Sequence, residues 1–240
     1  CGDTILEGAA LEPEIRTLCR YLQCCGAYIE GVGSSRLIIH GGRKLRGAAF
    51  TVPADRIVAG TYLFGCIGAG GNVLLERAPQ EEMAAVLALA RQMGGHVCTS
   101  PEGIYVQAPG RPRPVRLMTV PYPGFPTDLQ SVVLAAETLS CGCSRIEETI
   151  FENRFRIVDD LKKMGACIEK EDCRSVAVRG VDSLHGASLE ARELRGGAAL
   201  VVAGIMAEGE TIVSGCSYIY RGYENIGRDF RELGARVTSV

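Results

Sequence analysis

The sequence predicts an α+β fold built from a repeated unit of about 70 residues. Three observations support this prediction. Four segments carry apolar residues at the spacing of an amphipathic helix and end at a glycine, and these glycines (Gly26, Gly94, Gly165 and Gly234) lie 68, 71 and 69 residues apart. A short alternating strand pattern follows each glycine. Between these segments lie three helical stretches that are apolar almost all round, as is typical of helices buried on all sides.

The amphipathic helices and the strands behind them form the first half of each repeat. Each glycine provides the left-handed backbone conformation at which a helix ends. We expect these helices over residues 15–25, 83–93, 151–164 and 223–233. We expect the strands that follow them over 28–30, 96–98, 167–169 and 236–238, with a second strand in the three complete copies over 36–40, 103–107 and 175–179.

The apolar helices form the second half. We expect them over residues 55–70, 127–142 and 193–209, each followed by a closing strand over 72–76, 145–149 and 211–214. The resulting order of elements is of the βαβαββ type. Residues 2–7 match the closing strands, and the sequence begins at Cys1 instead of Met. We therefore expect this chain to be part of a longer protein.

Composition excludes several classes of protein. With 47% hydrophobic residues and a net charge of −2, the 240-residue chain is too apolar and too balanced in charge to be disordered. Charges of both signs are scattered along it, so nothing indicates binding to nucleic acid or to an anionic membrane surface. No apolar run reaches the roughly 18 residues of a membrane span, and no signal peptide is recognisable.

The cysteines and histidines do not indicate a metal centre. An odd number of cysteines, 11, favours a reducing compartment over a disulfide framework, and we expect most of them to be small buried hydrophobic residues. The segment Cys141-Gly142-Cys143 lacks the CxxC spacing and has no histidine nearby in the sequence. The three histidines are far apart in the sequence, so we expect no metal site and no cofactor.

Acidic residues at the starts of the apolar helices are the first candidates for chemistry. Asp55, Asp128 and Glu193 each stand where a carboxylate can cap free backbone N–H groups. Alternatively, helix starts that converge form an anion site whose carboxylates can act as bases. Arg56, Arg195 and Arg221 lie near helix starts and suit a phosphate or carboxylate ligand, although any single arginine can also be a surface ion pair.

Asp128 has the most constrained surroundings of the three acids. Pro123 and Pro126 bracket Phe125 just before Thr127 and Asp128. Because proline fixes φ, the chain approaches the helix in a limited set of conformations. Such a preorganised position suits a catalytic base.

Several strings in this sequence resemble those of the UDP-N-acetylglucosamine enolpyruvyl transferases, which belong to the enolpyruvate transferase family. The most specific are PGFPTD at 123–128 and ETIFENRF at 148–155. Shorter ones in the same order are EPEI at 12–15, DRI at 55–57, AGT at 59–61, MGA at 164–166 and RGY at 221–223. The resemblance covers essentially the whole chain. It implies an inside-out α/β barrel, with residues 1–52 ending a truncated first domain and residues 53–240 forming the second.

The resemblance also implies an activity. Enzymes of this kind are cytoplasmic and transfer the enolpyruvyl group of phosphoenolpyruvate to the 3-hydroxyl of UDP-N-acetylglucosamine, the first committed step of peptidoglycan synthesis. Asp128 would take the proton of that hydroxyl, Arg195 and Arg221 would hold phosphoenolpyruvate, and Glu193 would lie near the reacting carbon. The residues implied in binding the nucleotide sugar are Thr127, Asp128, the backbone of Ile150, Glu152, Asn153 and Arg56.

Some features depart from the family pattern. Tyr220 stands where an aspartate is usual, Gly196-Gly197 replaces a small polar pair, and Glu193 replaces an aspartate. The lysine that binds phosphoenolpyruvate and the loop with the reactive cysteine would lie in the missing first domain, so none of the cysteines here corresponds to it. Two alternatives remain: a non-catalytic partial paralogue that binds a nucleotide sugar, and an enzyme of the shikimate pathway similar to EPSP synthase.

Overall fold

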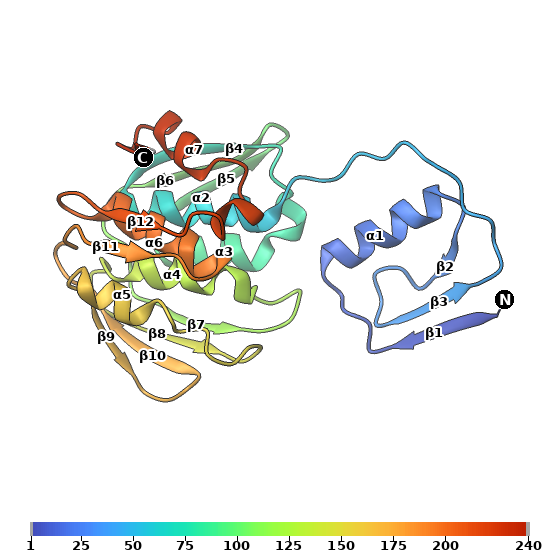
Figure 1. Ribbon diagram of the computed structural model, residues 1–240, viewed down its shortest axis with the longest axis horizontal. Coiled ribbons are helices and arrows are strands. Elements are labelled where there is room, and N and C mark those ends of the chain that lie inside the picture. The colour runs from blue at the N-terminus through green and yellow to red at the C-terminus, as the bar shows by residue number, and fades with distance from the viewer. Residues whose placement is uncertain (1, 239–240) are drawn as a thin grey trace. The chain divides into compact units, whose positions relative to one another are not determined.

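A computed structural model describes residues 2–238 and divides into two compact units (Figure 1). Unit 1 contains Cys1–Ala54 and the loop Pro121–Gly124, and unit 2 contains Asp55–Val120 and Phe125–Val240.

Unit 1 is a three-stranded antiparallel sheet with one helix. Its elements are β1 (Asp3–Glu7), α1 (Pro13–Cys24), β2 (Tyr28–Glu30) and β3 (Arg36–His40), and the strand order is β1-β3-β2. Pro13 begins α1, where its missing N–H is harmless. Among the described residues of unit 1, Cys19, Ile29 and Leu37 form the buried apolar cluster. Unit 1 therefore buries little apolar surface of its own.

Unit 2 contains three copies of the repeat. The first has α2 (Arg56–Ala69), β4 (Gly71–Glu76), a 3-10 turn (Gln80–Glu82), α3 (Ala84–Gln92), β5 (His96–Ser100) and β6 (Gly103–Ala108). The second has β7 (Arg116–Thr119), the 3-10 helix η2 (Thr127–Leu129), α4 (Gln130–Glu137), β8 (Cys143–Glu148), α5 (Val158–Lys163), β9 (Cys167–Lys170) and β10 (Ser175–Arg179). The third has β11 (Ser188–Glu190), α6 (Leu194–Met206), β12 (Ile212–Ser214), the 3-10 helix η3 (Ile219–Arg221) and α7 (Ile226–Glu232).

Strand order confirms the repeat predicted from the glycine spacing. The sheets β4-β6-β5 and β8-β10-β9 have the same antiparallel order as β1-β3-β2 in unit 1. In each case a helix joins the first strand to the strand at the far edge. The full βαβαββ order appears from β7 to β10.

Two strands were not predicted. β7 pairs in parallel with β8, and β11 pairs in parallel with β12. Each precedes a buried helix and pairs with the strand that follows that helix. Both are short, with 4 and 3 residues, so an alternating pattern has little room to show itself in the sequence.

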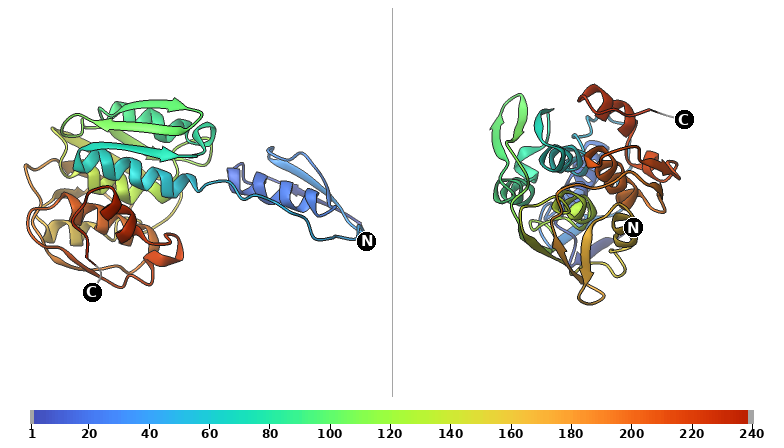
Figure 2. Two further views of the ribbon diagram at one scale, coloured as in Figure 1. Left: turned by 90° about the horizontal axis from the view of Figure 1, so that it is seen from above. Right: turned by 90° about the vertical axis from the view of Figure 1, so that its left-hand side faces the viewer.

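The buried helices form the centre of unit 2, as expected from their apolar sequences. α2, α4 and α6 pack against one another, and the sheets lie outside them (Figure 2). Every residue of α4 is buried, including Gln130 and Glu137. The acidic residues Asp55, Asp128 and Glu193 lie at the N-terminal ends of these central helices.

Three predicted elements differ from the structure. The helix expected from residue 151 begins only at Val158. Before it, the Glu148 carboxylate accepts the backbone N–H groups of Ile150 and Phe151, and Asn153 has a left-handed φ of 57°. The helix expected over 127–142 is shorter, with a 3-10 start and α4 ending at Glu137. Residues 236–238 form no strand; the carbonyl of Val237 accepts Arg231 Nε instead.

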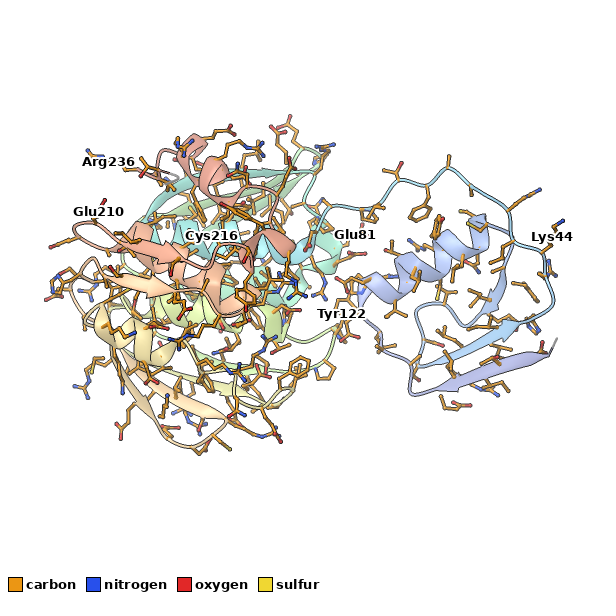
Figure 3. All side chains as sticks on the ribbon, viewed as in Figure 1. Lys44, Glu81, Tyr122, Glu210, Cys216 and Arg236 are labelled. Carbon is orange, nitrogen blue, oxygen red and sulfur yellow. The ribbon has the colours of Figure 1, made fainter. Side chains whose placement is uncertain are left out.

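The expectation that most cysteines are buried is wrong. Of the ten cysteines in the described part of the chain, all free thiols, only Cys19 and Cys25 are buried. Cys66 and Cys216 (the latter labelled in Figure 3) are half-buried. The Cys216 thiol donates to the carbonyl of Val213 at 3.2 Å. The six others are exposed, mostly at strand ends and loops. Within residues 2–238, no helix is long and apolar enough to cross a membrane, and no cluster of three metal-ligating side chains occurs.

Candidate active site

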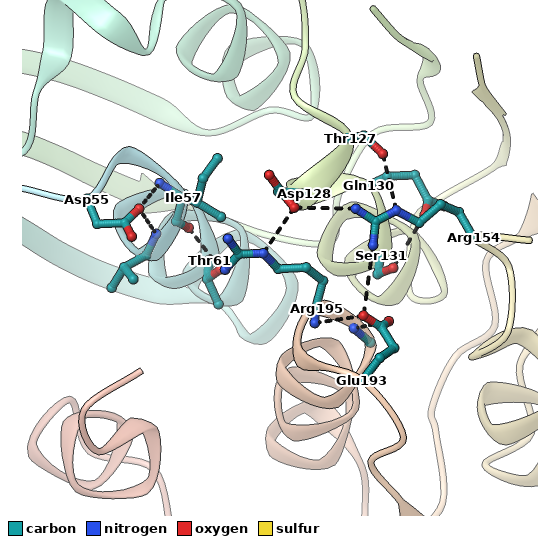
Figure 4. Close-up of polar contacts among 12 residues, drawn as sticks. Asp55, Ile57, Thr61, Thr127, Asp128, Gln130, Ser131, Arg154, Glu193 and Arg195 are labelled. Carbon is teal, nitrogen blue, oxygen red and sulfur yellow. Dashed lines mark hydrogen bonds and ion pairs between the residues drawn. The ribbon is translucent and has the colours of Figure 1, made fainter. Parts of the chain in front are cut away.

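The three acidic residues at the helix starts behave differently (Figure 4). Asp55 caps α2, since its Oδ1 accepts the N–H groups of Ile57 (2.7 Å) and Val58 (3.1 Å). Glu193 caps α6 in the same way, accepting the N–H groups of Arg195 and Gly196. Asp128 makes no such bond: it is the second residue of the 3-10 helix η2 and not its N-cap, and neither η2 nor α4 has a side-chain cap. Its carboxylate is therefore directed to other partners.

Those partners are two arginines. Asp128 Oδ1 accepts Arg195 Nε at 3.1 Å and Arg154 Nη2 at 3.3 Å. Arg195 comes from the first turn of α6, whereas Arg154 comes from the segment between β8 and α5. Both guanidinium groups use Oδ1, and no described residue hydrogen-bonds Oδ2. The Asp128 side chain is 37% exposed, and its Oδ2 keeps its capacity to accept a hydrogen bond or a proton from a ligand.

Arg154 connects the three parts of the cluster. Its Nε donates to Thr127 Oγ1 at 3.3 Å, and its Nη1 lies 3.8 Å from Glu193 Oε2. The ring of Phe151 covers one face of the guanidinium group, with Arg154 Cζ 5.1 Å from the ring centroid. These contacts fix the plane of a side chain that is only 17% exposed. Asp128, Glu193 and Thr127 are thus held around one cation.

Arg195 is the second cation of the cluster and is as buried as Arg154. Its side chain is 16% exposed, and its Nη1 is a buried donor without a hydrogen-bond partner in the described chain. Burial tends to lower the pKa of Arg195, but the neighbouring Asp128 and Tyr223 raise it above its ordinary value. An unpartnered N–H on a buried guanidinium group favours an anionic acceptor at that position.

Tyr223 supports this arrangement from the third repeat. It is 2% exposed, and its hydroxyl shares a 2.7 Å hydrogen bond with Thr61 Oγ1 on α2. Burial raises the pKa of Tyr223, although Thr61 and Arg195 oppose the rise. A neutral tyrosine therefore lies between α2 and the arginine of α6.

The structure brings together only some of the residues expected to form the site. Asp128, Thr127, Glu193 and Arg195 lie in one cluster. Arg56 is buried at the start of α2. Arg221 is exposed at the end of η3 and makes no ion pair within the described residues.

The expected residues of the 150–153 segment have different surroundings. The Ile150 N–H is bound by Glu148 at 2.8 Å. Exposed Glu152 lies 3.9 Å from Arg174 Nη2. Asn153 lines a cavity of about 470 Å³ together with Glu193. Asn153 therefore lies beside the cluster. Glu152 contacts Arg174, which is not part of the cluster.

Sequence reasoning gave no role to Glu148, Arg154 or Tyr223, which complete the cluster. Glu148 and Arg154 lie in the ETIFENRF string, but nothing in their spacing shows that they reach Thr127 and Asp128. Tyr223 was assigned to an apolar position of the last amphipathic helix and gave no sign of a polar contact. These contacts join residues 21 to 162 positions apart in the chain.

The family described as EPSP synthase (3-phosphoshikimate 1-carboxyvinyltransferase) matches residues 1–230. The chain belongs to this family.

Curated relatives align with the whole length of this chain. The UDP-N-acetylglucosamine 1-carboxyvinyltransferase of Novosphingobium aromaticivorans is 45% identical over 239 residues, which is 100% of this chain and 56% of that protein. The protein of the same name from Methylacidiphilum infernorum is 42% identical, again over 100% of this chain and 56% of its own length. The chain thus spans about half the length of the curated relatives it matches.

Solved structures of the family agree with the fold. The enolpyruvyl transferase NikO from Streptomyces tendae matches 99% of this chain with a TM-score of 0.86 at 25% identity, and this chain covers 57% of it. EPSP synthase from Acinetobacter baumannii matches 100% of the chain with a TM-score of 0.73 at 18% identity, over 58% of that enzyme. The second likeness concerns the fold alone.

Proposed function

We propose that this chain is the part of a UDP-N-acetylglucosamine 1-carboxyvinyltransferase that carries the base, Asp128. It would also carry two arginines, Arg195 and Arg221, that bind the anionic substrate. One observation carries the proposal: Asp128 is held by Arg154 and Arg195, while one N–H of Arg195 is buried without a partner. The relatives named for this activity, at 42–45% identity, support the same substrate pair. A cytoplasmic location follows from this proposal, because the two substrates are cytoplasmic metabolites.

The reaction would proceed by addition and elimination. Oxygen O3 of the sugar bonds to C2 of phosphoenolpyruvate while C3 gains a proton. Loss of a proton from C3 then re-forms the double bond as the C2–O bond to phosphate breaks and inorganic phosphate leaves. Asp128, through its Oδ2, would take the proton that the 3-hydroxyl loses. Arg195, and Arg221 with it, would bind the carboxylate and phosphate charges that must be stabilised.

The other residues would bind the nucleotide sugar. We assign this role to Thr127, the backbone of Ile150, Glu152, Asn153 and Arg56, and a place near the reacting carbon to Glu193. Residues 1–52 would end one domain and residues 53–240 would form the second. A preceding domain would complete the site, since the chain corresponds to just over half of its relatives. We propose no metal, cofactor, nucleic acid or membrane as a partner.

A second candidate is a non-catalytic relative that binds a nucleotide sugar. The observation that favours it is Tyr220, which stands before Arg221 where the family usually has an acidic residue. A relative of this kind would bind UDP-N-acetylglucosamine without consuming phosphoenolpyruvate. An EPSP synthase-like enzyme would instead require shikimate 3-phosphate as the acceptor.

Phosphate release separates these functions. We expect the protein that the gene encodes to release phosphate from phosphoenolpyruvate in the presence of UDP-N-acetylglucosamine, and not in the presence of shikimate 3-phosphate. We expect the 240-residue chain alone to release none. Calorimetric binding of UDP-N-acetylglucosamine without phosphate release would favour the non-catalytic candidate. Phosphate release from phosphoenolpyruvate with shikimate 3-phosphate as the acceptor, but not with UDP-N-acetylglucosamine, would contradict the proposal.

A further inference from the structure

We propose that Glu148 is a positioning residue that fixes Arg154 against Asp128 through the hydroxyl of Thr127. This inference rests on the proposed function, in which Asp128 is the base. Glu148 is the last residue of β8 and is 1% exposed. A carboxylate buried this deeply requires hydrogen-bond donors, and the identity of those donors indicates what it holds in place.

Glu148 receives three hydrogen bonds. Its Oε1 accepts the backbone N–H groups of Ile150 (2.8 Å) and Phe151 (3.0 Å). Its Oε2 accepts the hydroxyl of Thr127 at 2.7 Å. Thus one carboxylate ties the turn after β8 to the start of η2, where Asp128 follows Thr127 directly.

The polarity of these bonds determines the next contact. A carboxylate can only accept, so the Thr127 hydroxyl must direct its hydrogen at Glu148. The lone pairs of Thr127 Oγ1 then face the other way, where Arg154 Nε donates to them at 3.3 Å. Arg154 Nη2 in turn donates to Asp128 Oδ1. Glu148 never touches Asp128 or a substrate in this chain of contacts, and it acts by setting the direction of one hydroxyl.

Replacing the carboxylate by an amide of the same shape tests this polarity. In Glu148→Gln the amide oxygen can still accept both backbone N–H groups. The amide nitrogen then faces Thr127 as a donor, so the Thr127 hydroxyl hydrogen loses its acceptor. The hydroxyl can then rotate so that its hydrogen, and no longer a lone pair, faces Arg154 Nε. We expect kcat of the enolpyruvyl transfer to fall about tenfold to a hundredfold, as for loss of a charge-assisted hydrogen bond. KM for UDP-N-acetylglucosamine should change about twofold at most, because the turn at Ile150 keeps its acceptor.

Thr127 variants provide a second route that does not depend on the folding of the first. Thr127→Val, which removes the hydroxyl, should lower kcat as much as Glu148→Gln, and Thr127→Ser should restore most of that loss; a rise in KM for UDP-N-acetylglucosamine in Thr127→Val reports the contact of Thr127 with the sugar and is read separately from kcat. The double variant E148Q/T127V should be no slower than T127V, because both changes remove the same link. Glu147→Gln is the matched control, since Glu147 lies on the same strand but contacts Arg145. Multiplicative effects in the double variant would overturn the proposal.

A measurement without turnover separates this inference from the proposed function. In the 240-residue chain, the Nε–H resonance of Arg154 can be followed by nitrogen-15 NMR and assigned by its loss in Arg154→Lys. We expect it to shift and to exchange faster with water in E148Q and T127V, but not in E147Q. An unchanged Arg154 signal in both would overturn the positioning role even if the enzyme is active. A changed signal in the 240-residue chain, together with no consumption of phosphoenolpyruvate by the protein that the gene encodes, would keep the linkage and reject the proposed activity.

Discussion

Asp55 and Asp128 occupy the same place in successive repeats, yet one serves its own helix and the other does not. Asp55 satisfies two backbone N–H groups of α2. Asp128 satisfies none of α4 and instead binds Arg154 and Arg195. An acid at a helix start ordinarily stabilises that helix. The one that does not cap its helix is therefore the stronger candidate for chemistry, and the comparison can be tested from both sides.

Activity should show the largest difference between the two positions. Asp128→Asn keeps the shape of the side chain but weakens its ability to accept a proton. We expect kcat of the protein that the gene encodes to fall about a hundredfold to ten-thousandfold, the range for loss of a general base. Asp55→Asn retains an N-cap residue of equal quality, and its kcat should stay within about twofold of the wild type. Equal losses in both variants would show that the two acids do not differ in function.

The sequence predicted much of this contrast but not its outcome. The glycine spacing correctly predicted the repeat, and the all-round apolar pattern correctly predicted three central helices, because local patterns record helix ends and buried faces. Capping and catalysis require the same residue type, so the sequence alone left both possible for Asp55, Asp128 and Glu193. The structure distinguishes them: Asp128 lies within the 3-10 helix η2, which has no side-chain cap, so its carboxylate does not bind its own helix.

The unpredicted parts depend on contacts between distant residues. The strands β7 and β11 exist because β8 and β12 lie beside them. Likewise, the helix expected from residue 151 was wrong, since Glu148 holds the N–H groups of Ile150 and Phe151 in a turn. Arg154 belongs to the site because of the path that this turn imposes. A pattern of single residues carries no record of such pairings.

The far end of α4 extends the comparison from function to stability. Glu137, the last residue of α4, is fully buried; its Oε2 accepts the hydroxyl of Ser144, and its Oε1 has no partner among the described residues. Burial raises the pKa of Glu137 to about 7 from an ordinary value of 4.5, although Ser144 and Ser140 oppose the rise. The folded protein therefore keeps this proton to higher pH than the unfolded chain.

Glu137→Gln should change how stability depends on pH. Between pH 4.5 and about 7 the unfolded chain loses this proton first, so wild-type stability falls as pH rises and then levels off. Relative to its value at pH 4.5, the variant should gain about 3 kcal/mol over the wild type by pH 8. Chemical denaturation at several pH values measures this difference. Glu102→Gln in an exposed turn is the control and should follow the wild-type profile. A Glu137→Gln profile parallel to the wild type would contradict the buried-acid interpretation.

The smallest expected effect concerns the cap itself. Asp55→Ala removes the acceptor of the Ile57 and Val58 N–H groups, and we expect the free energy of unfolding of unit 2 to fall by about 1 kcal/mol, with less than half of that in Asp55→Asn. Hydrogen exchange of the first turn of α2 locates the change, because those amides should lose protection before the rest of the helix. If Asp55→Ala lowered kcat as strongly as Asp128→Asn without this local loss of protection, Asp55 would belong to the site, and capping would no longer distinguish the two helix starts.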